Sequence, residues 1–405
     1  MNEARLAERV ARESYGRLLA LLCARTHNVP AAEDALADAF AAALTAWPRS
    51  GAPDNPEAWL FAAAKRKLID ASRRARTAAA HEASLALIAD ELETEIGAER
   101  APDRRLELLF ACAHPAIEPG ARTPLMLQTV LGMSAERIAA AFLVAPAAMS
   151  QRLVRAKKRV AEARVPFETP PAAEWNARLD AVLQAIYAAY AEGWSDPEGV
   201  DPARAELAEE AIWLAGVLAA QTPHEPEALG LLALMLHLEA RRPARRVEGR
   251  YVPLESQDAS LWNLAMQGEA ELLLQRAAAF DRLGRFQLEA AIQSAHAARR
   301  GRGDVGWDAI VTLYDGLAAL TPSPVVQLNR AAALARRDGA LAGLEALNAI
   351  EAPALKSAQS YWALRADLLA RLGRRAQARA AYEEAIARER DGAVIRFLSE
   401  RRAAL

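Results

Sequence analysis

The sequence has little cysteine, almost no net charge and no long apolar run. Its two cysteines, Cys23 and Cys112, cannot form a disulfide framework and favour a reducing, cytoplasmic location. The longest apolar stretch, residues 228–238, is too short to cross a bilayer, so we expect no membrane contact. The first residues mix both charge signs without an apolar core, which argues against a signal peptide.

Glycine is modest and β-branched residues are sparse, whereas alanine is abundant. Because this composition favours helix over strand, we predict an all-α fold. With 53% hydrophobic and 25% charged residues the chain is globular. Its 405 residues exceed what one core holds, which predicts two or three domains.

Residue groupings typical of catalysis or metal binding are also missing from the sequence. Cys112 and His114 lie close together, but they lack the second ligand pair that a zinc site needs. His224 and His237 are interpreted as surface and helix-face residues. There is no phosphate-cradling glycine loop and no nucleophile elbow. We therefore expect neither enzymatic activity nor a cofactor or metal.

What the sequence does have is positive charge gathered in two places. The formal net charge is −2, yet residues 65–76 and residues 151–164 each carry six basic residues against one acidic residue. The acidic segment 81–99 separates them. This pattern predicts two distinct contacts with a polyanion.

The second basic segment follows a pair of short helical patterns. Ser134 is placed to cap a helix over residues 135–142, and Pro146 to begin the next one. One face of that next helix is apolar, and the other offers hydrogen-bond donors. The apolar face is Met149, Leu153, Ala156 and Val160, and the donor face is Ser150, Gln151, Val154, Arg155 and Lys158. A helix-turn-helix motif needs this arrangement, although a basic surface helix in a bundle fits it about as well.

The first basic segment lies on a helix predicted from Pro56, after a proline-rich loop at residues 47–59. Trp59 and Phe61 accompany its cations, a combination that suits unpaired nucleotides. For Trp59 itself, a place in the hydrophobic core is the favoured interpretation.

These segments resemble bacterial sigma factors. "AEDALADAFAAALTAWP" and "NPEAWLFAAAKRKLIDASRR" resemble the region that binds polymerase and melts the −10 element, and residues 120–160 are similar to the −35-reading domain. The layout resembles the extracytoplasmic-function group, and the long tail resembles the subgroup with a C-terminal extension. The implied domains are residues 1–76 for region 2, 77–103 for an acidic linker, 104–165 for region 4 and 166–405 for the extension.

The resemblance implies core RNA polymerase, through its β′ clamp and β flap, and promoter DNA as partners. The expected clamp-docking residues are Glu33, Asp34, Asp38 and Phe40. Capture of a flipped −10 base is expected in the loop 49–58 with Asp54 and Asn55, and strand separation at Arg66, Lys67, Asp70, Arg73 and Arg74. Reading of the −35 element is expected from Ser150, Gln151, Arg152, Arg155 and Lys158.

The C-terminal part reads as helix pairs after the proline-rich segment 165–175. Residues 361–386 carry the small and large residues of a tetratricopeptide pair, namely Trp362, Ala366, Leu369, Gly373, Ala378, Tyr382 and Ala385. Gly339 lies one 34-residue period before Gly373, and a weaker unit lies at 277–292. The segment 247–258 is expected to be extended and 299–308 to be a loop. This predicts a short, irregular solenoid that binds a protein or peptide.

Two functions fit the sequence. The leading one is a transcription initiation factor that works by binding, with a tail that either gates its activity or merely stabilises it. The alternative is a stand-alone helix-turn-helix regulator with a tetratricopeptide-like sensor. Specific binding to DNA without polymerase would favour the alternative.

Overall fold

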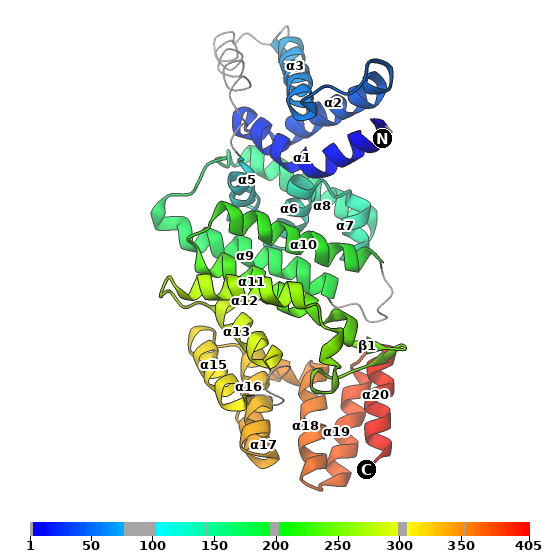
Figure 1. Ribbon diagram of the computed structural model, residues 1–405, viewed down its shortest axis with the longest axis vertical. Helices are drawn as coiled ribbons and strands as arrows, with labels where there is room; N and C mark the ends of the chain where they lie inside the picture. The colour runs from blue at the N-terminus through cyan, green and yellow to red at the C-terminus, as the bar shows by residue number, and fades with distance from the viewer. Residues whose placement is uncertain (1–2, 77–102, 143, 195–201, 299–305, 352) are drawn as a thin grey trace. The chain divides into compact units, whose positions relative to one another are not determined.

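The protein is described by a computed structural model that covers residues 3–76, 103–142, 144–194, 202–298, 306–351 and 353–405. Within these ranges it is helical apart from one short hairpin, which confirms the all-α prediction (Figure 1). The chain forms two compact units. Unit 1 comprises Met1–Gly193 with Glu206–Val217, and unit 2 comprises Trp194–Ala205 with Leu218–Leu405. Most of the predicted linker, residues 77–102, lies outside the described residues.

The described part of unit 1 consists of helices. They are α1 (Glu3–Thr26), α2 (Val29–Ser50), α3 (Pro56–Arg76), α5 (Arg105–Cys112), α6 (Pro119–Leu131), α7 (Ala135–Ala141), α8 (Pro146–Glu162) and α9 (Ala172–Trp194). The long helix α10 (Pro202–Gln221) has residues in both units. The proline-rich segment 165–175 is a connection only as far as Pro171, because α9 begins at Ala172, and most of α9 belongs to unit 1.

The ends of α2 show how local sequence sets the helix limits. At its start the Asn28 side chain accepts a hydrogen bond from the Ala31 amide at 3.1 Å, an N-cap. At its end the predicted loop 47–59 is too long, because α2 continues through Pro48 to Ser50. Trp47 is 1% exposed and so anchors this last turn in the core, and the Gly51 amide closes it on the Trp47 carbonyl. Tertiary burial thus outweighs the proline signal, and the true loop is residues 51–55.

Helix α1 contacts two groups of helices in unit 1, because it packs against α2 and α3 and also against α5 and α6. Its approach to α6 depends on Gly16. A Cβ atom at Gly16 would lie 1.9 Å from the carbonyl oxygen of Val130, so no side chain fits there. The lack of a side chain therefore sets the distance between α1 and α6.

Helix α9 completes the core around α5 and α6. The Arg178 guanidinium is buried and donates to the Phe110 carbonyl at 3.2 Å, and the Trp175 ring lies 5.1 Å from that of Phe110. Thr123 Oγ1 donates to the Ala185 carbonyl at 2.9 Å. These three contacts join residues 62 or more positions apart.

Unit 2 is a succession of helix pairs. Its elements are α11 (Pro226–Ala240), β1 (Arg246–Val247), β2 (Arg250–Tyr251), α12 (Leu264–Ala278), α13 (Arg285–Ala297), α15 (Trp307–Leu320), α16 (Pro324–Arg337), α17 (Ala340–Asn348), α18 (Gln359–Arg371), α19 (Arg375–Ala387) and α20 (Gly392–Ala403). Short 3-10 turns lie at Arg242–Ala244, Leu254–Ser256, Ala259–Leu261 and Pro353–Ser357.

The helix pair predicted around Gly373 is present as α18 and α19. Gly373 takes a left-handed φ of 71° between the two helices, and Gly339 takes a φ of 98° between α16 and α17. Ala366, Ala378 and Ala385 are fully buried, so these small residues allow the helices to pack closely. The tetratricopeptide character of the pairs stays a prediction.

Candidate functional site

Helix α8 has the two faces that the sequence predicts. Met149, Leu153, Ala156 and Val160 are all at most 5% exposed, which confirms the apolar face. The preceding helix α7 is capped by Ser134, whose Oγ accepts from the Arg137 amide at 3.3 Å, and α8 begins at Pro146. Each limit follows from one residue with a known positional preference.

The opposite face of α8 is open. Gln151, Val154 and Arg155 are exposed, and the Lys158 side chain is 73% exposed and faces Glu162 at 3.6 Å. Ser150 and Arg152 are half-buried at the margins. The predicted donors therefore share one accessible surface, and whether they contact DNA stays a prediction.

The first basic segment lies on α3. Arg66 is exposed and donates to the Ala62 carbonyl at 3.3 Å, while Lys67 lies 3.2 Å from the Asp38 carboxylate on α2. Asp70 is exposed too. The backbone of Arg73 and Arg74 continues α3, but their side chains lie outside the described residues.

The loop before α3 carries Asp54 and Asn55, and both are exposed. Asn55 Oδ1 accepts from the Ala58 amide at 3.1 Å, so this side chain caps α3. Trp59 packs edge-on against the buried Trp47 with ring centroids 5.7 Å apart. This contact supports the core interpretation of Trp59 over a role in base stacking.

The predicted docking residues on α2 differ in exposure. Asp34 and Asp38 are exposed, and the half-buried Phe40 ring stacks on Tyr15 at 6.5 Å. Glu33 is 14% exposed and pairs with Lys157 of α8, with Nζ 2.6 Å from Oε2. Burial raises the pKa of the Glu33 carboxyl, although Lys157 opposes this effect. Helices α2 and α8 are thus in direct contact.

Lys157 is the residue of this site that the sequence analysis missed. Its side chain is 13% exposed, unlike that of the neighbouring Lys158. A signal existed, because Lys157 lies four residues after the buried Leu153 and so borders the apolar face. A lysine at that margin can reach across to a facing helix.

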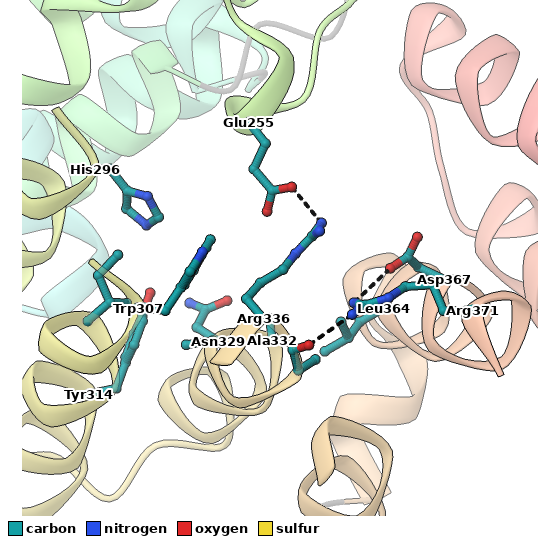
Figure 2. Close-up of a pocket in the computed structure, with 13 residues that line it drawn as sticks. Glu255, His296, Trp307, Tyr314, Asn329, Ala332, Arg336, Leu364, Asp367 and Arg371 are labelled. Atoms are coloured by element: carbon teal, nitrogen blue, oxygen red, sulfur yellow. Dashed lines mark hydrogen bonds and ion pairs between the residues drawn. The ribbon is translucent and has the colours of Figure 1, made fainter. Parts of the chain in front are cut away.

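A second candidate site is a cavity of about 200 Å³ in unit 2. Figure 2 shows the Trp307 indole and the His296 imidazole facing the guanidinium of Arg336, which bonds Glu255 at 2.6 Å. Asn329 and the pair of Asp367 with Arg371 complete the wall. The sequence analysis predicted that the solenoid binds a protein or peptide, but it named none of the residues of this cavity as ligand-binding.

The remaining predicted absences concern metals and membranes. Cys112 is buried with its Sγ 3.3 Å from Thr129 Oγ1, and burial raises its pKa to about 12. Among the described residues no three His, Cys, Asp or Glu side chains gather as metal ligands would. In the same part of the chain, no helix has the length and apolar character needed to span a membrane.

Comparison with known families matches two segments of the chain. Residues 10–78, which include α2 and α3, match the model of sigma-70 region 2, and residues 178–278 match a family of unknown function (DUF6596). The first match supports a factor of the sigma-70 type with a role in transcription initiation.

One relative aligns with most of the chain. "Uncharacterized protein R00370" of Rhizobium meliloti (strain 1021) is 41% identical over 367 residues, which cover 89% of this chain and 86% of the relative. Both proteins therefore belong to one family over most of their length. No solved structure matches the chain.

Proposed function

We propose that the chain is an extracytoplasmic-function sigma factor that directs core RNA polymerase to a two-part promoter and is regulated by its helical extension. The match of residues 10–78 to sigma-70 region 2 is the single observation that supports this most. That segment contains both the expected docking helix α2 and the basic helix α3.

In this proposal each exposed surface has a partner. The exposed Asp34 and Asp38 on α2 bind the β′ clamp, joined by Phe40 and by Glu33 once its pair with Lys157 opens. The loop 51–55 with α3 opens the −10 element. On α8, Arg155 and Gln151 suit the edges of guanine and adenine, while Lys158 suits a phosphate. The same helical unit would contact the β flap.

The ion pair between Glu33 and Lys157 adds a conformational step. The −10 and −35 elements lie about 25 base pairs apart by their own numbering, on the order of 85 Å of B-form duplex. Helices joined by a 2.6 Å contact cannot serve both elements and the polymerase clamp at once. Engagement of polymerase therefore separates α2 from α8, which frees Glu33 for the clamp.

The test is transcription in vitro from a genomic library with purified core polymerase. We expect promoter-specific transcripts that fall at least about tenfold with Arg73→Glu or Arg155→Glu, because each reversal replaces attraction to DNA with repulsion. Arg379→Glu, which reverses an exposed charge on α19, is the control and should change little. Absence of transcripts would refute the proposal, and tight specific DNA binding without polymerase would favour the stand-alone regulator.

A test of regulation by the extension needs a truncated chain that keeps the core of unit 1 intact. A chain cut at residue 171 loses α9, whose Trp175 and Arg178 complete the core of unit 1. A chain ending after Gln221 keeps both α9 and α10. If the extension gates the factor, this chain should transcribe at a different level from the full-length protein. Equal transcription from a less stable chain would instead assign the extension a stabilising role.

A further inference from the structure

One segment of unit 2, residues 246–256, contacts two helices that are far apart in the sequence, α16 and α20. Residues 246–251 form a hairpin whose turn, Glu248 and Gly249, has φ values of 51° and 72°. The hairpin is fixed to α20 at three points. Arg246 pairs with Asp391, the Gly249 carbonyl accepts from Arg396 at 2.8 Å, and the Tyr251 ring packs edge-on against Phe397 at 5.5 Å.

The same segment then reaches α16. After Pro253 the chain makes one 3-10 turn, Leu254–Ser256, and presents the Glu255 carboxylate to Arg336 at 2.6 Å. Both side chains of this pair are 39% exposed. Residues 246–256 thus link α20 to α16, and Leu364, Asp367 and Arg371 of the intervening α18 line the cavity beside Glu255.

The cavity has the chemistry of a carboxylate site. Its basic wall is Arg336 with Arg371, and Arg371 is held by Asp367 at 3.8 Å and by the Ala335 carbonyl at 2.9 Å. Trp307 with Tyr314 forms the opposite, aromatic wall (Figure 2). A guanidinium suits a carboxylate, and the guanidinium of Arg336 already binds one, that of Glu255, while Arg371 beside it adds positive charge to the same wall.

We propose that this cavity binds an acidic side chain of an extended peptide from a partner protein, and that the Glu255 side chain is an internal occupant which the partner displaces. The ion pair between Glu255 and Arg336 is exposed, so it contributes little by itself and exchanges readily. Tethering favours the internal segment, because it gives that segment an effective concentration in the millimolar range. A partner competes once its additional contacts along α16 and α18 outweigh the tether.

Binding can be measured without polymerase or DNA, so its result does not depend on the sigma-factor proposal. The probe is a fluorescein-labelled synthetic peptide that copies residues 250–258, and the readout is fluorescence anisotropy with the full-length chain. The release variant carries Arg246→Ala and Glu255→Ala. We expect it to bind the probe at least about tenfold more tightly than wild type, because the internal competitor is weakened. A probe with glutamine in place of its glutamate should bind about tenfold more weakly.

Matched variants locate the site. Arg336→Ala in the release variant should abolish binding, whereas Arg330→Ala should leave it unchanged, because Arg330 lies on the same helix but pairs with Asp315. Glu255→Gln alone provides a milder release variant, and thermal melting checks that every variant is folded. Three outcomes would each overturn the proposal. They are equal binding of the probe by wild type and both release variants, failure of both release variants to bind it although they are folded, and equal effects of the two arginine changes. Displacement of the probe by inorganic phosphate at the same concentration as by unlabelled peptide would mean a general anion site, which also overturns it.

Discussion

At the scale of single residues, the contact between Glu33 and Lys157 makes the sharpest prediction. Both side chains are at least 86% buried, and removing one partner leaves the other charge buried without compensation. Lys157→Ala should therefore lower the free energy of unfolding by about 3 kcal/mol, as measured by urea denaturation. Glu33→Gln with Lys157→Met removes both charges and should cost less than about 1 kcal/mol.

Lys158→Ala is the neighbouring control for this pair. Its side chain is 73% exposed, so the change should alter the free energy of unfolding by less than about 0.5 kcal/mol. A similar cost for Lys157→Ala and Lys158→Ala would mean that α2 and α8 do not touch in solution.

His237 on α11 makes stability depend on pH. It is 2% exposed, and burial lowers its pKa below the ordinary 6.5, while Glu271 at 3.5 Å raises it and Arg241 lowers it further. Between about pH 6.5 and the lowered pKa of the folded state, the unfolded chain binds a proton at this residue to a greater extent than the folded chain does. Stability should therefore fall as the pH drops from about 6.5 toward the lowered pKa of the folded state.

His237→Leu tests this effect. The urea midpoint of wild type should drop between about pH 7.5 and pH 5.5, and the drop should be smaller in the variant because one proton-linked group is gone. His224→Ala, which alters an exposed histidine, should keep the wild-type difference. An unchanged pH dependence in His237→Leu would show that other groups produce it.

Residue patterns predicted burial better than they predicted partners. The spacing of Met149, Leu153, Ala156 and Val160 was enough to identify the buried face of α8. It could not identify Lys157 as the partner of Glu33, because the two residues are 124 positions apart and only the packing of α8 on α2 brings them together. The capping bond from the Ala58 amide to Asn55 is local in sequence, but it was not predicted, because Asn55 was interpreted as a base-capturing residue.

At the scale of elements, α8 separates stability from recognition. Leu153 is 1% exposed and Val154 is 61% exposed, although they are adjacent. Leu153→Ala should lower the free energy of unfolding by about 2–5 kcal/mol because it leaves a cavity. Val154→Ala should change it by less than about 0.5 kcal/mol, and circular dichroism in urea measures both. Comparable losses would contradict the observed orientation of α8.

Helix limits were predictable where one residue decides them. Ser134 and Pro146 each begin a helix as predicted from their positional preferences. Asn28 caps α2 for the same physical reason, although this cap was not predicted. The prediction was wrong at Pro48, where a buried tryptophan keeps the helix going. The segment 247–258 was expected to be extended, and its hairpin at 246–251 fits, but its contacts with α16 and α20 were not predictable from local pattern.

At the scale of the whole molecule, the proline-rich segment 165–175 is not where the compact units divide. Helix α9 beyond it packs on α5 and α6, and α10 places Trp213 under the Arg105 guanidinium at 5.3 Å. A chain of residues 1–171 exposes Phe110 and should be less stable than residues 1–221 by more than about 3 kcal/mol. Thermal or urea unfolding of the two chains measures the difference, and equal stability would contradict the packing of α9.

The sequence predicted the helical class and both basic helices, but it could not divide the chain as the structure does. Composition and proline spacing report on local chain stiffness, whereas compact units depend on contacts between distant residues. The bonds from Thr123 to Ala185 and from Arg178 to Phe110 are of this kind. The domain limits that we inferred from proline-rich segments therefore stay predictions.

A substitution at Gly16 can be used to disturb the packing of α1 on α6 and, through it, the contact between Glu33 and Lys157. One added methyl group would wedge α1 away from Val130 and should expose the amine of Lys157, so that acetylation by a small reagent accelerates several-fold. Gly120→Ala, whose new methyl meets no atom within 4 Å, should leave that acetylation rate as it is. A Gly16→Ala protein would thus supply the opened form for capture with polymerase.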